Sequence, residues 1–221
     1  MTDVEWHWLG RQSYGPMLER QRSRRSSVIQ HTEPEVVWLL EHEPTITTGR
    51  REVHGLPSQT DLAASGIGLF KTERGGLATY HGPGQLMVYP ILNCWKRGIG
   101  AKVAVKTIED AIIDWLIDTG IEGTRRPGFP GIWVGTDKIA AIGMHFRQGV
   151  SMHGAAINLS KNLSGFDLIT PCGITDGGIT SVENEIGFAP SPQEAAPEVA
   201  KHLLRNLRAP RCLSECTTDT P

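Results

Sequence analysis

The chain of 221 residues is long enough for one sizeable hydrophobic core but short for two full domains. Its apolar fraction of 39% and charged fraction of 21% are those of a soluble globular protein, and the net charge of −2 lacks the basic excess of a general nucleic-acid binder. No apolar stretch approaches the length of a membrane span, and the start MTDVEWHWLGRQ does not have the pattern of a signal peptide. We therefore expect a cytoplasmic protein that binds neither nucleic acid nor membrane.

The cysteines, Cys94, Cys172, Cys212 and Cys216, are few and irregularly spaced. No secretory signal is recognised, so reduced thiols are expected rather than a disulfide framework. Cys212 and Cys216 fall in a polar segment rich in Thr and Pro, and their role is left open. We predict one domain over residues 1–210 and a flexible C-terminal tail over residues 211–221.

The first half of the chain alternates strand and helix patterns. Residues 4–9 are near-alternating and predict a strand, residues 14–29 predict a helix, and residues 35–42 (EVVWLLEH) predict a buried strand. The arginines between Arg20 and Arg25 are expected to form a solvated face. Together with Arg125 and Arg126 they are also candidates for contact with acidic partner proteins.

The middle of the chain begins with a predicted strand over residues 67–72. Residues 74–85 (RGGLATYHGPGQ) contain too much glycine for a strand or a helix, and a clear apolar strand follows over residues 86–92. Apolar residues at helical spacing from Val105 to Leu116 predict a helix that stops at Gly120.

The second half predicts more strands. Residues 131–135 and 138–146 suggest a hairpin, and residues 149–160 a strand interrupted by Gly154. Residues 166–181 have a loop-like composition. The sequence from Ser191 to Glu194 has the form of a capping box, but Pro197 would then lie inside the helix, so we expect the last helix to begin near Pro197. The irregular mixture predicts an α+β fold with a mixed sheet flanked by helices.

The glycine-rich segment also carries chemical groups. Its glycines allow a sharp turn and a close approach to a ligand, and Arg74, Tyr80 and His81 lie in the same short stretch. It matches neither of the common phosphate-binding glycine motifs. These features favour a ligand-facing loop over a plain turn between strands.

Cys172 lies between a proline and a glycine (TPCGI), whereas Cys94 follows an apolar strand as a structural cysteine would. A thiol reacts as the thiolate, so Cys172 would need a neighbouring cation or base. Lys138 is one candidate, because it opens an apolar segment expected to be buried, where a lysine can exchange protons. His81 is the other, and the sequence alone does not decide between them.

Other kinds of site find less support. His145, His153 and Cys172 lack zinc-ligand spacing and no CxxC is present, so no metal site is predicted. His153 is expected to line a pocket or to bond the backbone. The G-x-S-x-G signal of a serine hydrolase is missing.

Four ordered segments, RGGLATYHGPGQLMVYPI, GIWVGTDKIAAIG, HGAAIN and PCGI followed by TS, resemble the lipoyl(octanoyl) transferases. The resemblance spans about Arg74 to Ser181. It implies the fold of the lipoate and biotin protein ligases. It also implies a reaction without cofactor, in which octanoyl (or lipoyl) passes from acyl carrier protein to a lysine of a lipoyl domain. The implied acceptors are the lipoyl domains of 2-oxoacid dehydrogenases and the glycine cleavage H protein.

The same resemblance implies the roles of individual residues. Cys172 would carry the acyl group as a thioester, and Lys138 would be its catalytic partner. Ala155 stands where a bulkier residue is expected, which leaves the preferred acyl length open. The implied acyl pocket comprises Arg74, Gly75, Gly76, Leu77, Ala78, Thr79, Tyr80, His81, Ala141, Ile142, Gly143, Gly154, Ala155 and Ala156.

Three alternatives remain. An ATP-dependent lipoate or biotin ligase would share the fold but would need ATP and no nucleophilic cysteine. A lipoyl amidotransferase would take its acyl group from another protein lysine. A non-catalytic binding module would form no acyl adduct, and the presence of both Cys172 and Lys138 in their motifs argues against it.

Overall fold

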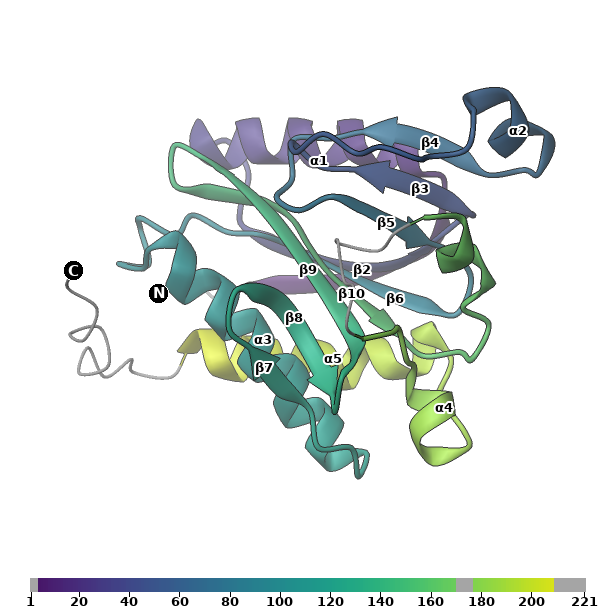
Figure 1. Ribbon diagram of the computed structural model, residues 1–221. Coiled ribbons are helices and arrows are strands. Elements are labelled where there is room, and N and C mark those ends of the chain that lie inside the picture. The colour runs from purple at the N-terminus through teal and green to yellow at the C-terminus, as the bar shows by residue number, and fades with distance from the viewer. Residues whose placement is uncertain (1–3, 170–176, 209–221) are drawn as a thin grey trace, which may run out of the picture.

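A seven-stranded sheet forms the centre of the protein, whose computed structural model describes residues 4–169 and 177–208 (Figure 1). The strand order is β1-β2-β6-β10-β9-β8-β7. The strands are β1 (Glu5–Gln12), β2 (Val36–His42), β6 (Gln85–Ile91), β7 (Thr124–Arg126), β8 (Phe129–Val134), β9 (Asp137–Arg147) and β10 (Val150–Asn158).

A smaller, three-stranded sheet has the order β4-β3-β5. It consists of β3 (Thr45–Thr48), β4 (Gly68–Lys71) and β5 (Ala78–His81). Each sheet contains one parallel pair, β1 with β2 and β3 with β4, while the remaining pairs are antiparallel. The expected α+β fold with a mixed sheet is confirmed.

Helices cover both faces of the large sheet. Figure 1 shows α1 on one face and α3 with α5 on the other. The helices are α1 (Tyr14–Ile29), α2 (Gln59–Ala64), α3 (Ala101–Asp118), α4 (Val182–Ile186) and α5 (Pro192–Arg208), with a short 3₁₀ helix, η1 (Ser164–Leu168).

The alternation of side chains along the strands divides the core into two main clusters. On β6, Leu86 and Val88 pack toward α3 and α5, whereas Met87 and Tyr89 pack toward α1. The strand is buried on both faces, and this explains its continuous apolar sequence.

Several predicted elements are confirmed with nearly the same bounds. The helix expected over residues 14–29 is α1, and the strand expected over residues 35–42 is β2. The predicted hairpin is formed by β8 and β9. The helix expected to end at Gly120 is α3, which begins earlier than expected, at Ala101.

The predicted start of the last helix is wrong, because α5 begins at Pro192 rather than near Pro197. The capping box is formed: the Glu194 amide donates to the Ser191 hydroxyl at 3.3 Å, and the Ser191 amide donates to the Glu194 carboxylate at 2.8 Å. Pro197 lies close to the helix start, where it removes one backbone bond and leaves the cap intact.

The prediction that residues 74–85 contain no strand is also wrong, because Ala78–His81 form β5. This strand pairs with β3, a short Thr-rich strand that the sequence analysis did not identify. The glycines therefore lie on either side of a short paired segment rather than throughout a loop.

The expected solvated arginine face on α1 is wrong for Arg25, which is 6% exposed. Arg20 and Arg24 lie against the Trp38 ring, with guanidinium-to-ring distances of 4.7 and 5.6 Å. Within the described residues, no helix combines the length and the apolar character needed to cross a membrane.

Candidate active site

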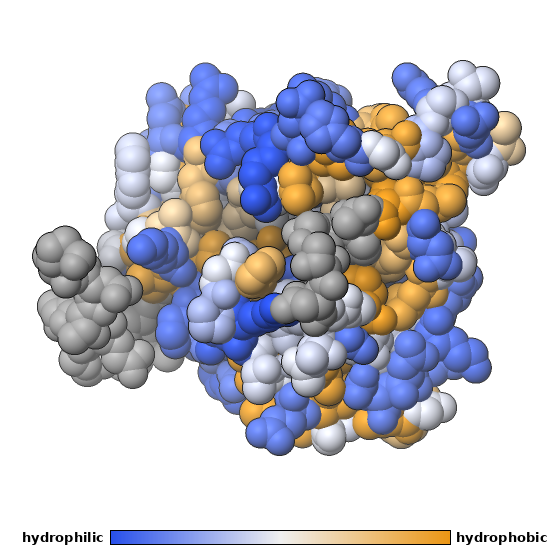
Figure 2. Space-filling model, viewed as in Figure 1, coloured by the Kyte–Doolittle hydropathy of each residue, from blue (hydrophilic) through white to orange (hydrophobic). Residues whose placement is uncertain are grey.

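A cavity of about 450 Å³, its open mouth included, lies on the α1 face of the large sheet, beneath the glycine-rich segment. Figure 2 shows apolar residues gathered on the viewed face over the three-stranded sheet, beside a band of strongly hydrophilic residues. The cavity is lined by Tyr14, Arg74, Gly75, Gly76, Thr79, His81, Met87, Tyr89, Ala141, Ile142, Gly143, His153, Gly154, Ala155 and Ala156.

Most of the residues expected in the acyl pocket therefore meet around one cavity. Leu77, Ala78 and Tyr80 do not line it. Ala78 packs into a separate core cluster with Ile46, and Tyr80 contacts the Phe166 ring in a neighbouring hollow. The alternation of β5 explains this, since Thr79 and His81 point toward the cavity and their neighbours point away.

Tyr14, Met87 and Tyr89 are cavity residues that the sequence analysis missed. For Met87 and Tyr89 a signal existed, because the alternation of LMVYPIL places them on one face of a strand. Tyr14 is the first residue of α1, and nothing in its sequence context marks it. Burial raises its pKa to about 12, so its hydroxyl stays protonated.

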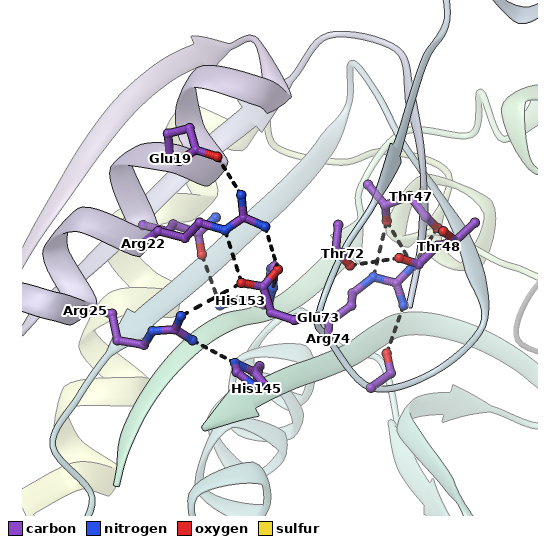
Figure 3. Close-up of polar contacts among 12 residues, drawn as sticks. Glu19, Arg22, Arg25, Thr47, Thr48, Thr72, Glu73, Arg74, His145 and His153 are labelled. Carbon is purple, nitrogen blue, oxygen red and sulfur yellow. Dashed lines mark hydrogen bonds and ion pairs between the residues drawn. The ribbon is translucent and has the colours of Figure 1, made fainter. Parts of the chain in front are cut away.

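Arg74 fixes one wall of the cavity by binding Thr47 of β3 (Figure 3). Its Nη2 donates to the Thr47 carbonyl at 2.6 Å and to the Thr47 hydroxyl at 2.9 Å, and its Nη1 donates to the Gly75 carbonyl at 2.9 Å. The Gly75 amide donates in turn to the Met144 carbonyl of β9 at 3.1 Å. The segment is thereby tied to both sheets.

The absence of a side chain at Gly143 lets this segment lie close to β9. A Cβ at Gly143 would lie 3.1 Å from the Gly75 carbonyl oxygen and 3.3 Å from the Arg74 side chain. A larger residue at Gly143 would push the segment away from the sheet.

His81 is held neutral inside a polar network. Its Nδ1 donates to the Gln85 side-chain carbonyl at 2.8 Å, and its Nε2 accepts from the Thr47 hydroxyl at 3.2 Å. Burial lowers the pKa of His81 to about 3. With both ring nitrogens bonded and protonation disfavoured, His81 orients the cavity wall and is poorly placed as a general base.

The network continues from Gln85 toward Lys138. Gln85 donates to the Asn158 side chain at 2.9 Å, and Asn158 donates to the Thr180 carbonyl at 3.0 Å. The Thr180 amide donates to the Lys138 carbonyl at 3.0 Å. A chain of buried hydrogen bonds therefore joins the cavity wall to the backbone of Lys138.

A second polar cluster surrounds Glu73, next to Arg74 (Figure 3). Arg22 of α1 donates to both Glu73 oxygens at 3.2 and 2.9 Å, and His153 Nε2 lies 3.8 Å from one of them. The His153 ring and the Arg22 guanidinium hold the pKa of Glu73 well below its usual range. Arg25 binds His145 Nδ1 at 2.7 Å on the same side. The cluster fastens α1 to β9, to β10 and to the start of the glycine-rich segment.

His153 has an unusual backbone conformation, with φ of 61° in the middle of β10. The left-handed conformation is rare for a non-glycine residue, and it interrupts the side-chain alternation of the strand. It turns the ring toward Glu73 and the cavity, and the Gln21 side chain accepts the His153 amide at 3.0 Å. Burial lowers the pKa of His153, and its Nε2 is buried without a hydrogen bond.

Lys138 is 3% exposed, which confirms the expectation that it is buried. Its Nζ donates to the Pro130 carbonyl at 3.2 Å and lies 4.7 Å from the centre of the Trp133 ring. Its amide donates to the Gly178 carbonyl at 3.0 Å, so its backbone is paired with residues that follow Cys172 in the chain. Lys138 does not line the cavity itself but lies on β9 close to Ala141, which does.

Cys172 lies outside the described residues, and so do Cys212, Cys216 and the predicted tail over residues 211–221. Cys94 is buried, as expected for a structural cysteine. In the described part of the chain, no group of three or more His, Cys, Asp and Glu side chains is placed to hold a metal ion.

Comparisons with known proteins agree with this architecture. Residues 16–204 match the family described as the lipoyl protein ligase A/B catalytic domain. An octanoyltransferase of Alkaliphilus metalliredigens is 44% identical over 187 residues, covering 81% of this chain and 84% of the relative.

Solved structures support the fold. A lipoate-protein ligase A bound with ATP superposes with a TM-score of 0.71 at 15% identity, covering 93% of this chain and 86% of the other. A biotin protein ligase from Aquifex aeolicus gives a TM-score of 0.55 at 15% identity, covering 92% of this chain and 70% of the other. Because the family match spans most of the chain and the fold agrees, this protein belongs to the lipoyl protein ligase A/B catalytic domain family and is a transferase enzyme.

Proposed function

We propose that this enzyme transfers an octanoyl group from acyl carrier protein to a lysine of a lipoyl domain, in the cytoplasm, through a thioester on Cys172. The acceptors would be the lipoyl domains of 2-oxoacid dehydrogenases and the glycine cleavage H protein. The observation that carries the proposal is the cavity, whose floor of alanine and glycine is formed by β10 and by β9, the strand that also carries a buried lysine. The similarity to octanoyltransferases over most of the chain supports the acyl group chosen.

The proposed reaction has two acyl transfers. The Cys172 thiolate attacks the thioester of the donor, the carrier thiolate leaves, and a Cys172 thioester forms. The lysine amine of the lipoyl domain then attacks that thioester, releases the Cys172 thiolate and loses a proton. Exchange between thioesters is nearly balanced in free energy, whereas amide formation is favourable. The two acyl transfers together therefore need no ATP.

Lys138 would take part in both steps, and its burial would allow it to be charged in the first step and neutral in the second. As a cation it favours the Cys172 thiolate before acylation. After acylation that negative partner is gone, and the burial of Lys138 then favours the neutral amine. Neutral Lys138 can then accept a proton from the incoming amine, whose free pKa is about 10.4. Backbone N–H groups near Cys172 or Gly76 would stabilise the tetrahedral oxyanion.

The first test is the intact mass of the protein after incubation with octanoyl-acyl carrier protein, without ATP. We expect one added octanoyl group, lost on hydroxylamine treatment and absent in Cys172→Ala. Cys94→Ala is the matched control, because Cys94 is buried and structural, and it should still take up the group. An adduct that persists in Cys172→Ala would contradict the thioester proposal.

The same experiment separates the alternatives. Activity that appears only with ATP and free octanoic acid would indicate a ligase, the activity suggested by the structural relative bound with ATP. Transfer that occurs only from an octanoylated lipoyl domain would indicate an amidotransferase.

A second test isolates the proton transfer by Lys138. Lys138→Arg keeps a positive charge but cannot lose its proton near neutral pH. We expect Cys172 acylation to continue in this variant, while transfer to the lipoyl-domain lysine falls at least about a hundredfold. Lys201→Arg, at an exposed lysine of α5, is the control and should retain both steps. Equal rates of amide formation in wild type and Lys138→Arg would exclude the proposed role.

A further inference from the structure

The floor of the cavity is a trough of small residues that crosses two neighbouring strands. Gly143 on β9 faces Gly154 on β10, and Ala141 on β9 faces Ala156 on β10. Directly opposed residues of an antiparallel pair point to the same face, so these residues form two adjacent rows on the α1 face. Ala155 and Ile142 also border the cavity, but they pack with the core under α3 and α5.

The trough ends at the third strand, where the side chains become large. Met87 of β6 faces Ala156, and Tyr89 follows two residues later on the same face. Both residues line the cavity. Figure 1 shows β9, β10 and β6 side by side, so the trough runs across the strands toward β6.

The length of the trough, measured across the strands from β9 to β6, corresponds to the length of an extended eight-carbon chain. Neighbouring strands lie about 4.8 Å apart, so the distance from β9 to β6 is about 10 Å. An extended octanoyl group, with carbon–carbon bonds of about 1.5 Å in a zigzag, is about 9 Å long. Because β9 carries Lys138, the reacting end belongs at β9 and the methyl end at β6.

The two residues of the end wall differ in rigidity. The Tyr89 hydroxyl donates to His42 Nε2 at 2.9 Å, and His42 Nδ1 donates to the Gln12 carbonyl at 2.8 Å, so the ring is fixed. Met87 has a flexible thioether side chain without such an anchor. Behind it lie Leu40 of β2, its direct neighbour, and other apolar residues of the same core cluster.

We propose that Met87 is the residue that sets the acyl-chain length, by closing the β6 end of the trough against the methyl end of the chain. This inference rests on the proposed octanoyl transfer. Shortening Met87 to alanine removes three heavy atoms and opens the wall toward Leu40. A longer acyl chain then extends into apolar surroundings instead of colliding with the thioether.

The test compares acyl-carrier thioesters of six to fourteen carbons, with kcat/KM for transfer as the readout. Wild type should be most active with eight carbons. Met87→Ala should shift the optimum to ten or twelve carbons, since each added methylene that finds apolar contact is worth about fourfold. Met87→Val, which suits a strand and removes less, should give a smaller shift in the same direction.

Met17→Ala is the matched control, because Met17 is equally buried in the same core cluster but does not line the cavity. Both alanine variants should lower Tm, while Met17→Ala should keep the eight-carbon optimum. If the optimum of Met87→Ala and Met87→Val stays at eight carbons, the inference is wrong even though octanoyl transfer stands. If wild type transfers no acyl group of any length, the proposed function itself fails.

Discussion

The two faces of the large sheet are both buried, but they are built differently. Toward α3 and α5 the sheet presents large apolar side chains such as Ile132, which shares a core cluster with Trp115 and Leu116 of α3. Toward α1 it presents small residues to a cavity and buries polar groups, among them His81 and His153, around it. The comparison indicates that the first face supplies stability, whereas the second gives up packing to create a binding surface.

The largest expected difference between the faces is in the stability lost when Gly154 or its neighbour Ala155, both on β10, is substituted. A Cβ at Gly154, on the cavity face, would lie 2.0 Å from the Val88 carbonyl oxygen, so Gly154→Ala forces the strands apart. We expect a loss of about 3 kcal/mol in the free energy of unfolding, the upper end of the usual range for overpacking. Ala155→Gly, on the other face, should lose only about 1 kcal/mol. Urea unfolding of both variants measures these losses of free energy. Similar losses would contradict the proposed difference between the two faces of the sheet.

The buried histidines of the cavity face should make the protein sensitive to acid. Burial lowers the pKa of His42 to about 4 and that of His81 to about 3, so the unfolded chain binds more protons than the folded one below pH 6.5. Stability is complete above that pH. It should fall by about 1.4 kcal/mol per pH unit for each histidine as the pH drops toward the folded pKa.

His42→Gln keeps a donor and an acceptor but does not titrate, so it should flatten that decline. Urea unfolding of wild type and of His42→Gln at pH 7.5, 6.0 and 5.0 gives, for each protein, the slope of the free energy of unfolding against pH. A slope unchanged from wild type would mean that His42 takes no part in the acid response.

Two threonines of β3 differ in their hydrogen-bond partners. Thr47 joins Arg74 to His81, so Thr47→Val should cost about 1–3 kcal/mol and lower kcat/KM about tenfold. The Thr45 hydroxyl donates to the nearby Glu43 carbonyl at 2.8 Å, and Thr45→Val should cost about 1 kcal/mol with normal activity. Denaturation and steady-state kinetics on both variants would show whether the network matters beyond stability.

The smallest effect is expected outside the cavity face, at an exposed ion pair. Arg205 of α5 lies 2.8 Å from Asp114 of α3, and the two side chains are 59% and 35% exposed. Arg205→Ala should change the free energy of unfolding by about 0.5 kcal/mol or less, because water and salt screen the pair. A thermal melt at two salt concentrations checks this, and a large salt-dependent loss would mean that the pair is stronger than its exposure suggests.

Regular patterns in the sequence were enough to predict most of the framework. The helical spacing of the apolar residues in α3 and the continuous apolar run of β6 indicated a helix and a strand, and both elements are observed. Pro197 misled the prediction because the helix continues through this proline, with its start set by the capping box at Ser191 and Glu194. The short strand β5 was missed because its stability comes from pairing with β3, which is a tertiary contact.

The cavity was predicted less completely than the framework. The glycine and alanine motifs pointed to its floor and to Arg74, but the positive φ of His153 has no signal in a single sequence. The contact between Glu73 and Arg22 joins residues far apart in the chain, and only the folded arrangement of α1 brings them together. Such long-range polar contacts are beyond what local patterns can indicate.

The pairing of Lys138 with Gly178 and Thr180 has a consequence for amide hydrogen exchange. Both backbone groups of Lys138 bond this later segment. Its amide should therefore exchange with solvent whenever residues 178–180 detach, even while the rest of β9 stays protected. The exchange rate of this one amide would thus report how often the chain that follows Cys172 undocks from the sheet.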